Sequence, residues 1–113
     1  GTGTILNDSM EGKLTHDIFG ENTPCSSSKS LTGHTLGTSG IIEASLCWLL
    51  LSSENRDKKL PIHYWDGIAD PEIPPIFLCQ PNMNFPSKKT WYTLSNSFAF
   101  GGNNGSIILG KTN

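Results

Sequence analysis

The sequence lacks several features that assign a protein to a functional class at first sight. Its 113 residues include three cysteines, an odd number without CxxC spacing, which indicates neither a disulfide framework nor a zinc site. No stretch approaches the ~20 uninterrupted apolar residues of a membrane-spanning helix, and no signal peptide is recognisable. The net charge of −2 gives no argument for nucleic acid as a partner. We therefore expect a protein of a reducing, cytoplasmic setting, without a membrane span or a bound metal.

Two further absences concern nucleotide binding and the start of the chain. No GxxxxGK[ST] motif is present, so a phosphate-binding P-loop is not indicated. The chain also begins without Met, in the middle of what reads as a motif, Gly1-Thr-Gly-Thr4. A chain of this length normally forms one domain with a modest core. We interpret residues 1–113 as one domain of a longer protein.

Apolar periodicity predicts two helices. Asn7 or Asp8 can cap the first helix, which has Glu11 in its first turn and ends at Gly20. The second helix covers residues 41–51, the longest apolar segment of the chain, and has no polar face. Because a helix that is apolar all round must be covered on every side, we expect a buried central helix that needs further chain or a second subunit around it.

The other elements are expected to be extended. Residues 23–29 form a polar extended segment, and residues 60–86, with six of the seven prolines, form a long ordered loop around a short strand at residues 76–79. Residues 91–98 and 106–109 are predicted strands, and Asn-Gly in the turn between them is a strong hairpin signal. This order predicts the α/β class, with a mixed or antiparallel C-terminal sheet edge.

The stretch from Lys29 to Glu43 carries the first signal of a functional site. Each of its glycines at positions 33, 37 and 40 would cost about 1 kcal/mol in a helix interior relative to alanine, which suggests that something approaches the backbone. His34 stands at the expected start of the apolar helix, and Lys29 at the expected end of a strand. A Lys29–Glu43 pair behind the imidazole would hold it and set its pKa. The alternatives are a capping or core histidine and a plain buried ion pair.

Glycine-rich loops and an aromatic pair add to this signal. Small residues dominate three loops, residues 1–4 with Thr2 and Thr4, residues 33–40, and residues 101–105. Such loops are most often tight turns, but three in one short chain favour a shared cleft. Phe98 and Phe100 precede the Gly101-Gly102 pair. They are either alternating strand residues or an aromatic gate whose backbone N–H can donate to an oxyanion.

No residue of the chain stands out as a nucleophile. Cys47 lies in the apolar helix and is expected to be a small buried hydrophobe. Cys25 and Cys79 have no adjacent histidine or helix start that would lower their thiol pKa values. His16 and His63 are expected at the surface. The residues thus predict a ligand cleft with an oxyanion-stabilising histidine, without a nucleophile of its own.

Three motifs of the chain resemble those of the β-ketoacyl-acyl-carrier-protein synthases. Residues 29–40, Lys-Ser-Leu-Thr-Gly-His-Thr-Leu-Gly-Thr-Ser-Gly, closely resemble the family's second histidine motif. Residues 95–105, Ser-Asn-Ser-Phe-Ala-Phe-Gly-Gly-Asn-Asn-Gly, look like its gating-phenylalanine motif. Gly1-Thr-Gly-Thr4 matches the end of its His-Gly-Thr-Gly-Thr motif, with Asp8 and Glu11 at the family's spacing. The motifs occur in the family's order and span nearly the whole chain.

The resemblance implies a fold and a reaction. The fold is thiolase-like, a layered αβαβα sandwich of two related halves that dimerises, and residues 1–113 would be the C-terminal domain. A cysteine on the N-terminal half takes an acyl group from acyl carrier protein. Decarboxylation of malonyl-carrier protein then gives a carbanion that attacks the acyl thioester, a Claisen condensation of fatty-acid or polyene biosynthesis. No cofactor is implied, because the substrates are carried on the phosphopantetheine of the carrier protein.

The resemblance also implies roles for individual residues. His34 would donate to the thioester carbonyl as enolate character develops, and Lys29, paired with Glu43, would order the site. The Phe100 N–H would form part of the oxyanion hole. The gate would consist of Phe98, Phe100, Gly101 and Gly102, and Thr2 and Thr4 would touch the pantetheine arm.

Departures from the family's pattern leave alternatives open. The nucleophilic cysteine and the first histidine are absent from this chain, and Ala99 and Asn103 replace the family's usual glycine and threonine around the gate. The Phe-Ala-Phe-Gly-Gly-Asn-Asn motif at residues 98–104 and the Trp65–Pro71 loop look similar to the corresponding segments of synthases of the aryl-polyene type. The alternatives are a non-catalytic subunit resembling a chain-length factor, which would form a ketosynthase heterodimer rather than a homodimer, and a free-standing carrier- or nucleotide-binding module.

Overall fold

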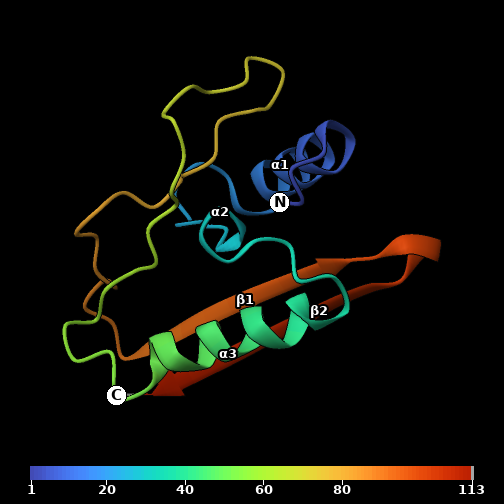
Figure 1. Ribbon diagram of the computed structural model, residues 1–113. Coiled ribbons are helices and arrows are strands. Elements are labelled where there is room, and N and C mark those ends of the chain that lie inside the picture. Colours follow the sequence, from blue (N-terminus) through green and yellow to red (C-terminus); the bar gives the residue numbers. More distant parts are fainter. Residues whose placement is uncertain (113) are drawn as a thin grey trace. The chain divides into compact units, whose positions relative to one another are not determined.

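The computed structural model describes residues 1–112, which form two compact units (Figure 1). Unit 1 comprises residues 1–34 and 61–83, and unit 2 comprises residues 35–60 and the chain from Asn84 onward. Each unit therefore combines two separate segments of the chain. None of the helices within residues 1–112 has the length and apolar character that crossing a membrane requires.

Unit 1 begins with helix α1, Ile5–Phe19, which ends at Gly20 as predicted. The prediction that Asn7 or Asp8 caps this helix is wrong, because the helix begins directly after Thr4 and Asp8 lies within its first turn. The proline-rich segment packs closely on α1: a Cβ atom at the buried Gly12 would lie 2.5 Å from Ile73 Cγ2. His16 Nδ1 also donates to the Pro75 carbonyl at 2.8 Å. Glycine at position 12 thus permits this close approach.

The segment predicted to be extended, residues 23–29, is only partly so. Its strand pairing is one parallel bridge between Cys25 and Leu78, which is also what remains of the strand expected at residues 76–79. Lys29 does not end a strand, contrary to the prediction, but begins the short helix α2, Lys29–Thr32. The physical reason lies in the serines, whose side chains compete for backbone hydrogen bonds. Ser27 Oγ accepts the Lys29 N–H at 3.3 Å, and the Ser28 carbonyl accepts those of the following turn.

Unit 2 is one helix packed on an antiparallel hairpin. The 3₁₀ turn η1, Leu36–Thr38, leads into helix α3, Ser39–Leu51, and strands β1, Thr90–Phe98, and β2, Asn104–Thr112, pair along their full length. Helix α3 contacts both strands. The α/β class and the antiparallel edge are therefore confirmed. Over residues 1–112, the sheet contains no parallel strand.

The core of unit 2 gathers around Trp91 at the start of β1. Trp91 is buried and stacks on Phe85, with ring centroids 5.2 Å apart, and its Nε1–H donates to the Pro86 carbonyl at 2.8 Å. The Lys58 ammonium lies 5.5 Å from the centroid of the same ring. Leu51 at the end of α3 is also buried. These contacts anchor the strand end that lies farthest from the hairpin tip.

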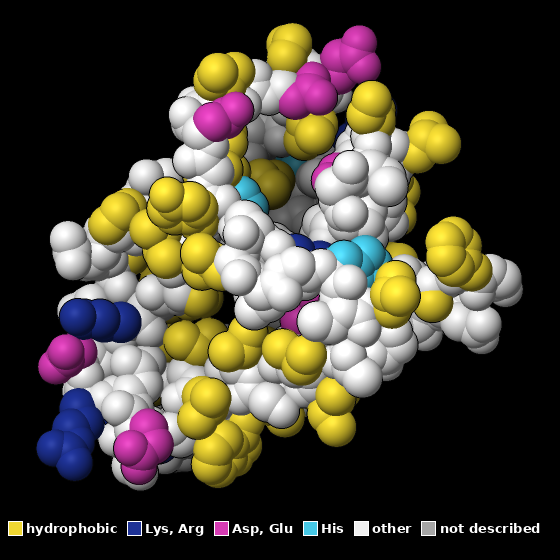
Figure 2. Space-filling model, viewed as in Figure 1, with side chains coloured by type: hydrophobic (Ala, Val, Ile, Leu, Met, Phe, Trp, Pro, Cys, Tyr) yellow, Lys and Arg dark blue, Asp and Glu magenta, His cyan; other side chains and the backbone are white. Residues whose placement is uncertain are grey.

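Helix α3 exposes much of its apolar surface in this chain. Ile41 and Trp48 are 71% and 62% exposed, and Leu46 and Leu49 are exposed as well. Figure 2 shows apolar side chains gathered over α3 on the viewed face. Within unit 2, the hairpin contacts one side of the helix and leaves these apolar side chains exposed, as the all-apolar sequence predicts. What covers the other side in a longer protein stays a prediction.

Candidate active site

The loop before α1 is organised by one carboxylate. Asp8 accepts the backbone N–H of Thr2 at 2.6 Å through Oδ1 and that of Gly3 at 3.0 Å through Oδ2. The hydroxyls of Thr2 and Thr4 are 2.8 Å apart, so the two side chains face one another. Gly3 has φ +75°, a conformation that favours glycine. The loop therefore presents two adjacent hydroxyls on a backbone that Asp8 holds.

The ionised form of Asp8 is the one that makes these contacts. Burial alone would raise the pKa of its carboxyl, but hydrogen bonds from Thr2, Asn7 and Gly3 outweigh that effect and hold the pKa below its ordinary value of 3.8. Asp8 therefore contributes stability that is complete above pH 3.8 and is lost as the pH falls through its folded-state pKa.

Asp8→Asn is expected to lower the free energy of unfolding by about 1 kcal/mol at neutral pH, because one backbone donor loses its acceptor in a partly exposed site. Urea unfolding of the full-length protein at pH 7 and near pH 3 measures this difference, which should shrink at the lower pH. Asp17→Asn, at an exposed position on α1, is the matched control. A stability difference of the same size at both pH values would contradict the role of the Asp8 charge.

The stretch with Lys29 and His34 belongs to unit 1. The Gly33 N–H donates to the Lys29 carbonyl at 2.9 Å and closes α2, and Gly33 has φ +74°, which only glycine adopts readily. His34 follows as an exposed residue. The prediction that His34 stands at the start of the apolar helix is wrong, because η1 intervenes and α3 begins only at Ser39. His34 is instead presented by the turn that ends α2.

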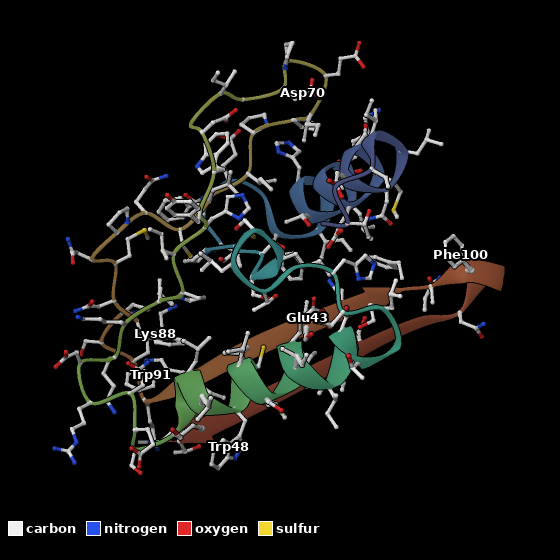
Figure 3. All side chains as sticks on the ribbon, viewed as in Figure 1. Glu43, Trp48, Asp70, Lys88, Trp91 and Phe100 are labelled. Carbon is white, nitrogen blue, oxygen red and sulfur yellow. The ribbon has the colours of Figure 1, made fainter. Side chains whose placement is uncertain are left out.

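The gate residues lie at the tip of the hairpin of unit 2. Phe98 and Asn104 are the last pair of the ladder, and the Ala99 N–H donates to the Asn103 carbonyl at 2.8 Å to close the loop. Gly101 and Gly102 have φ values of +75° and +77°, so both positions require glycine. Phe100 is fully exposed, and Figure 3 shows it at the tip, away from Trp91 at the other end of the strand.

The backbone at this tip offers a donor. Within residues 1–112, the Phe100 N–H donates to no backbone acceptor, while its carbonyl accepts the Asn103 side-chain amide at 3.2 Å. An N–H group held in a fixed loop is the kind of donor that stabilises an oxyanion. The geometry of the tip is therefore compatible with the predicted oxyanion role.

The predicted site residues are divided between the two units. Thr2, Thr4, Lys29 and His34 belong to unit 1, whereas Glu43 and the gate belong to unit 2. Glu43 lies half-buried on the first half of α3 (Figure 3). The ion pair between Lys29 and Glu43 stays a prediction.

The three cysteines have the properties of structural thiols. Burial raises the pKa of the Cys25 and Cys47 thiols, and burial together with the neighbouring Cys25 raises that of Cys79 to about 11. Since the thiolate is the nucleophile, a raised pKa makes each of them less reactive at neutral pH. Within residues 1–112, no three His, Cys, Asp or Glu side chains are grouped so that they could hold a metal ion.

Sequence reasoning missed two residues that organise this region. Asp8 was expected at a helix cap, but its carboxylate fixes the Thr2–Gly3 backbone instead. His63 was expected at the surface, and this is wrong: it is half-buried, and its Nδ1 accepts the Ser27 N–H at 3.1 Å. The spacing of Asp8 after a Gly-Thr-Gly-Thr loop was a usable signal. For His63 there was none, because its partner lies 36 residues away.

Comparison with known proteins identifies the family. A family model described as "Beta-ketoacyl synthase, C-terminal domain" matches residues 1–61, more than half of the chain. The chain belongs to this family. The matched range includes the Gly1–Thr4 loop and the whole stretch from Lys29 to Glu43, and the resemblance seen in the motifs is confirmed. The hairpin-tip motif lies beyond the matched range but inside the region that individual relatives cover.

Those relatives are longer enzymes. The 3-oxoacyl-[acyl-carrier-protein] synthase 1 of Haemophilus influenzae is 32% identical over 114 residues, covering 100% of this chain and 27% of the relative. The synthase 1 of Buchnera aphidicola subsp. Acyrthosiphon pisum is 36% identical over 118 residues, and the synthase 2 of Coxiella burnetii is 29% identical over 114 residues; each alignment covers 98% of this chain and 26% of the relative. The chain thus spans about a quarter of the length of these curated relatives. No solved structure gives a significant match.

Proposed function

We propose that the protein to which this chain belongs is a β-ketoacyl-acyl-carrier-protein synthase, of which residues 1–113 form the C-terminal domain. The observation that carries the proposal is the family match over residues 1–61, since this range holds five of the predicted site residues: Thr2, Thr4, Lys29, His34 and Glu43. The names of the similar proteins describe synthases that act on acyl carrier protein. Carrier-bound thioesters of the fatty-acid type are therefore the proposed substrates.

The proposed reaction is a decarboxylative Claisen condensation. An acyl group is first held as a thioester on a cysteine outside this chain. Malonyl-carrier protein then loses CO₂, and the resulting enolate carbon forms a bond to the acyl carbonyl carbon while the cysteine thiolate leaves. The products are a 3-oxoacyl-carrier protein, CO₂ and the regenerated cysteine. No cofactor is needed in this scheme, because the phosphopantetheine arm belongs to the carrier protein.

The residues of this chain supply donors for the negative charge that develops. His34, on an exposed turn, donates to the malonyl thioester oxygen as it becomes an enolate. The Phe100 N–H donates to the oxyanion formed when the enolate attacks, and the ring of Phe100 with the Gly101-Gly102 pair forms the gate. Thr2 and Thr4 offer their paired hydroxyls to the polar groups of the pantetheine arm. Lys29 and Glu43 order the site as an ion pair.

The proposed assembly follows from the same family membership. The partners are the N-terminal half of the protein, acyl carrier protein and a second ketosynthase subunit. The exposed apolar side of α3, with Ile41 and Trp48, is a surface that such additional structure would have to cover. A homodimer is the proposed state.

The full-length protein tests the proposal directly. Incubated with acyl- and malonyl-carrier protein, it should release CO₂ and form a 3-oxoacyl-carrier protein, detected by mass spectrometry, with the acyl group first appearing on a cysteine outside this chain. A protein that condenses only when mixed with a second ketosynthase subunit, and that carries no acylated cysteine, would instead be a subunit of the chain-length-factor kind.

The chain of residues 1–113 alone is expected to form no acyl-enzyme. Its three thiols have pKa values raised by burial, so none is poised as a nucleophile. Intact-mass measurement after exposure to acyl-carrier protein checks this expectation, with iodoacetamide labelling of the unfolded chain as the control that the thiols are chemically competent. A stable thioester on Cys25, Cys47 or Cys79 would contradict it.

A further inference from the structure

A small hydrogen-bonded cluster in unit 1 connects three short segments, residues 25–27, 62–63 and 77–79. Cys25 lies between two residues of the proline-rich segment: its N–H donates to the Phe77 carbonyl at 2.7 Å, and its carbonyl accepts the Cys79 N–H at 2.9 Å. The Cys79 carbonyl in turn accepts the His63 N–H at 2.9 Å. The third segment, with Ile62 and His63, is therefore fixed against the other two through backbone groups.

The side chain of His63 extends this cluster toward Lys29. His63 Nδ1 accepts the Ser27 N–H at 3.1 Å, and next to it Ser26 Oγ donates to the Ile62 carbonyl at 3.0 Å. Ser27 Oγ then accepts the Lys29 N–H at 3.3 Å. A continuous hydrogen-bonded path thus runs from the His63 imidazole through Ser27 to the first residue of α2.

The hydrogen bond that His63 Nδ1 accepts defines the protonation state of the imidazole. Nδ1 can accept an N–H only if it carries no proton, so His63 is neutral with its proton on Nε2. Burial lowers the pKa of His63, which favours this neutral form at physiological pH. The ring also lies against Trp65, with centroids 6.0 Å apart. Its orientation is therefore restrained by Trp65 as well as by the Ser27 hydrogen bond.

Helix α2 depends on these hydrogen bonds because it is too short to be stable by itself. It has four residues, and a single helical turn is unstable without external contacts. Its N-cap residue, Ser28, makes no side-chain capping hydrogen bond. The first donor of the helix, the Lys29 N–H, is instead accepted by Ser27 Oγ, and the N–H of Ser27 donates in turn to His63. The position of Lys29 therefore depends on a residue outside the range that the family model matches.

We propose that His63 is a positioning residue for Lys29, acting through the Ser27 backbone to fix the start of α2. This inference rests on the proposed function, since it assigns Lys29 a part in the reaction. His63 does not contact the substrate in this scheme. It holds the backbone of residues 26–28 in place, and this backbone fixes the position from which the Lys29 side chain extends.

Two nearly isosteric variants of the full-length protein separate the hydrogen bond from the shape of the side chain. His63→Leu removes the acceptor, whereas His63→Asn retains an acceptor oxygen close to the position of Nδ1. We expect His63→Leu to increase amide hydrogen exchange about tenfold in peptides covering residues 26–29, and to reduce the rate constant of malonyl decarboxylation about tenfold, with acyl loading unchanged. His63→Asn should restore most of both quantities. His16→Leu, which removes a histidine hydrogen bond elsewhere in unit 1, is the control and should leave exchange at residues 26–29 unchanged.

The outcomes distinguish the inference from the function on which it rests. Unchanged exchange at residues 26–29 in His63→Leu would overturn the support of α2 by His63, whatever the reaction. Raised exchange with an unchanged decarboxylation rate would overturn the positioning role. A wild-type protein without any decarboxylation would overturn the proposed function instead, and it would do so before any variant is compared. If His63→Leu fails to fold, His63→Gln, whose amide lies nearer to the Nε2 position, serves as the second variant without a Ser27 acceptor.

Discussion

His34→Ala in the full-length protein is expected to slow malonyl decarboxylation by about 10²–10³-fold while acyl loading stays largely intact. The expected size is that of removing one preorganised donor from a site where negative charge develops. Loading does not create an enolate on the malonyl thioester, so it should not require this histidine. His34 lies on the turn after α2, is exposed within this chain, and follows a glycine whose φ is +74°. Its replacement therefore removes a functional group without removing a core contact.

Rapid mixing with malonyl-carrier protein, with CO₂ release followed separately from acylation of the nucleophilic cysteine, measures the two steps. His16→Ala is the matched control, because His16 also lies in unit 1 and its imidazole donates to the Pro75 carbonyl, outside the proposed site. An equal loss of loading and decarboxylation in His34→Ala would mean that His34 has a structural role, and would remove it from the catalytic residues.

The elements that sequence reasoning predicted well are those specified by local patterns. Helix α1 ends at Gly20, residues 41–51 are helical, and two antiparallel strands flank the glycine-rich turn, as predicted; Asn104 and Gly105, however, pair with β1 as part of β2 and do not form the turn. Each of these features follows from neighbouring residues: a glycine with positive φ, an uninterrupted apolar run, and two strand-like runs on either side of a glycine-rich turn. The exposed apolar side of α3 follows from the same pattern, because more of the helix is apolar than a single hairpin can cover.

The details that sequence reasoning missed arise from contacts between distant segments or from competition within the serine run. Lys29 was expected to end a strand, but the side chain of Ser27 and the carbonyl of Ser28 accept the N–H groups of a helical turn that begins there. His63 was expected at the surface, yet its imidazole accepts a hydrogen bond from a segment that only the folded chain brings near. Hydropathy and spacing contain no information about such a pairing.

The candidate site shows the same division. The glycines at the hairpin tip and after α2 have positive φ values that other residues rarely adopt. The motifs alone therefore indicated where the backbone requires glycine. The pairing of Lys29 with Glu43 was predicted from their charges as well as from the family resemblance, but neither gives its geometry, since the two residues are 14 positions apart and lie in different units. Their interaction is therefore the feature of the site for which an experiment is most informative.

Lys29→Met and Glu43→Gln are expected to be strongly non-additive in malonyl decarboxylation by the full-length protein. Removing one partner of an ion pair leaves the other charge unmatched, so each single variant should lose about 10²-fold, whereas the double variant should be no worse than the more damaged single one. Kinetics of all four proteins give the coupling free energy, for which we expect about 2.7 kcal/mol, the equivalent of one 10²-fold effect. Glu54→Gln, at an exposed position after α3, replaces Glu43→Gln in a control cycle and should give no coupling. Effects of Lys29 and Glu43 that multiply independently would show that the two charges act separately, and the ordering role of Glu43 would then be withdrawn while a direct electrostatic role of Lys29 would remain.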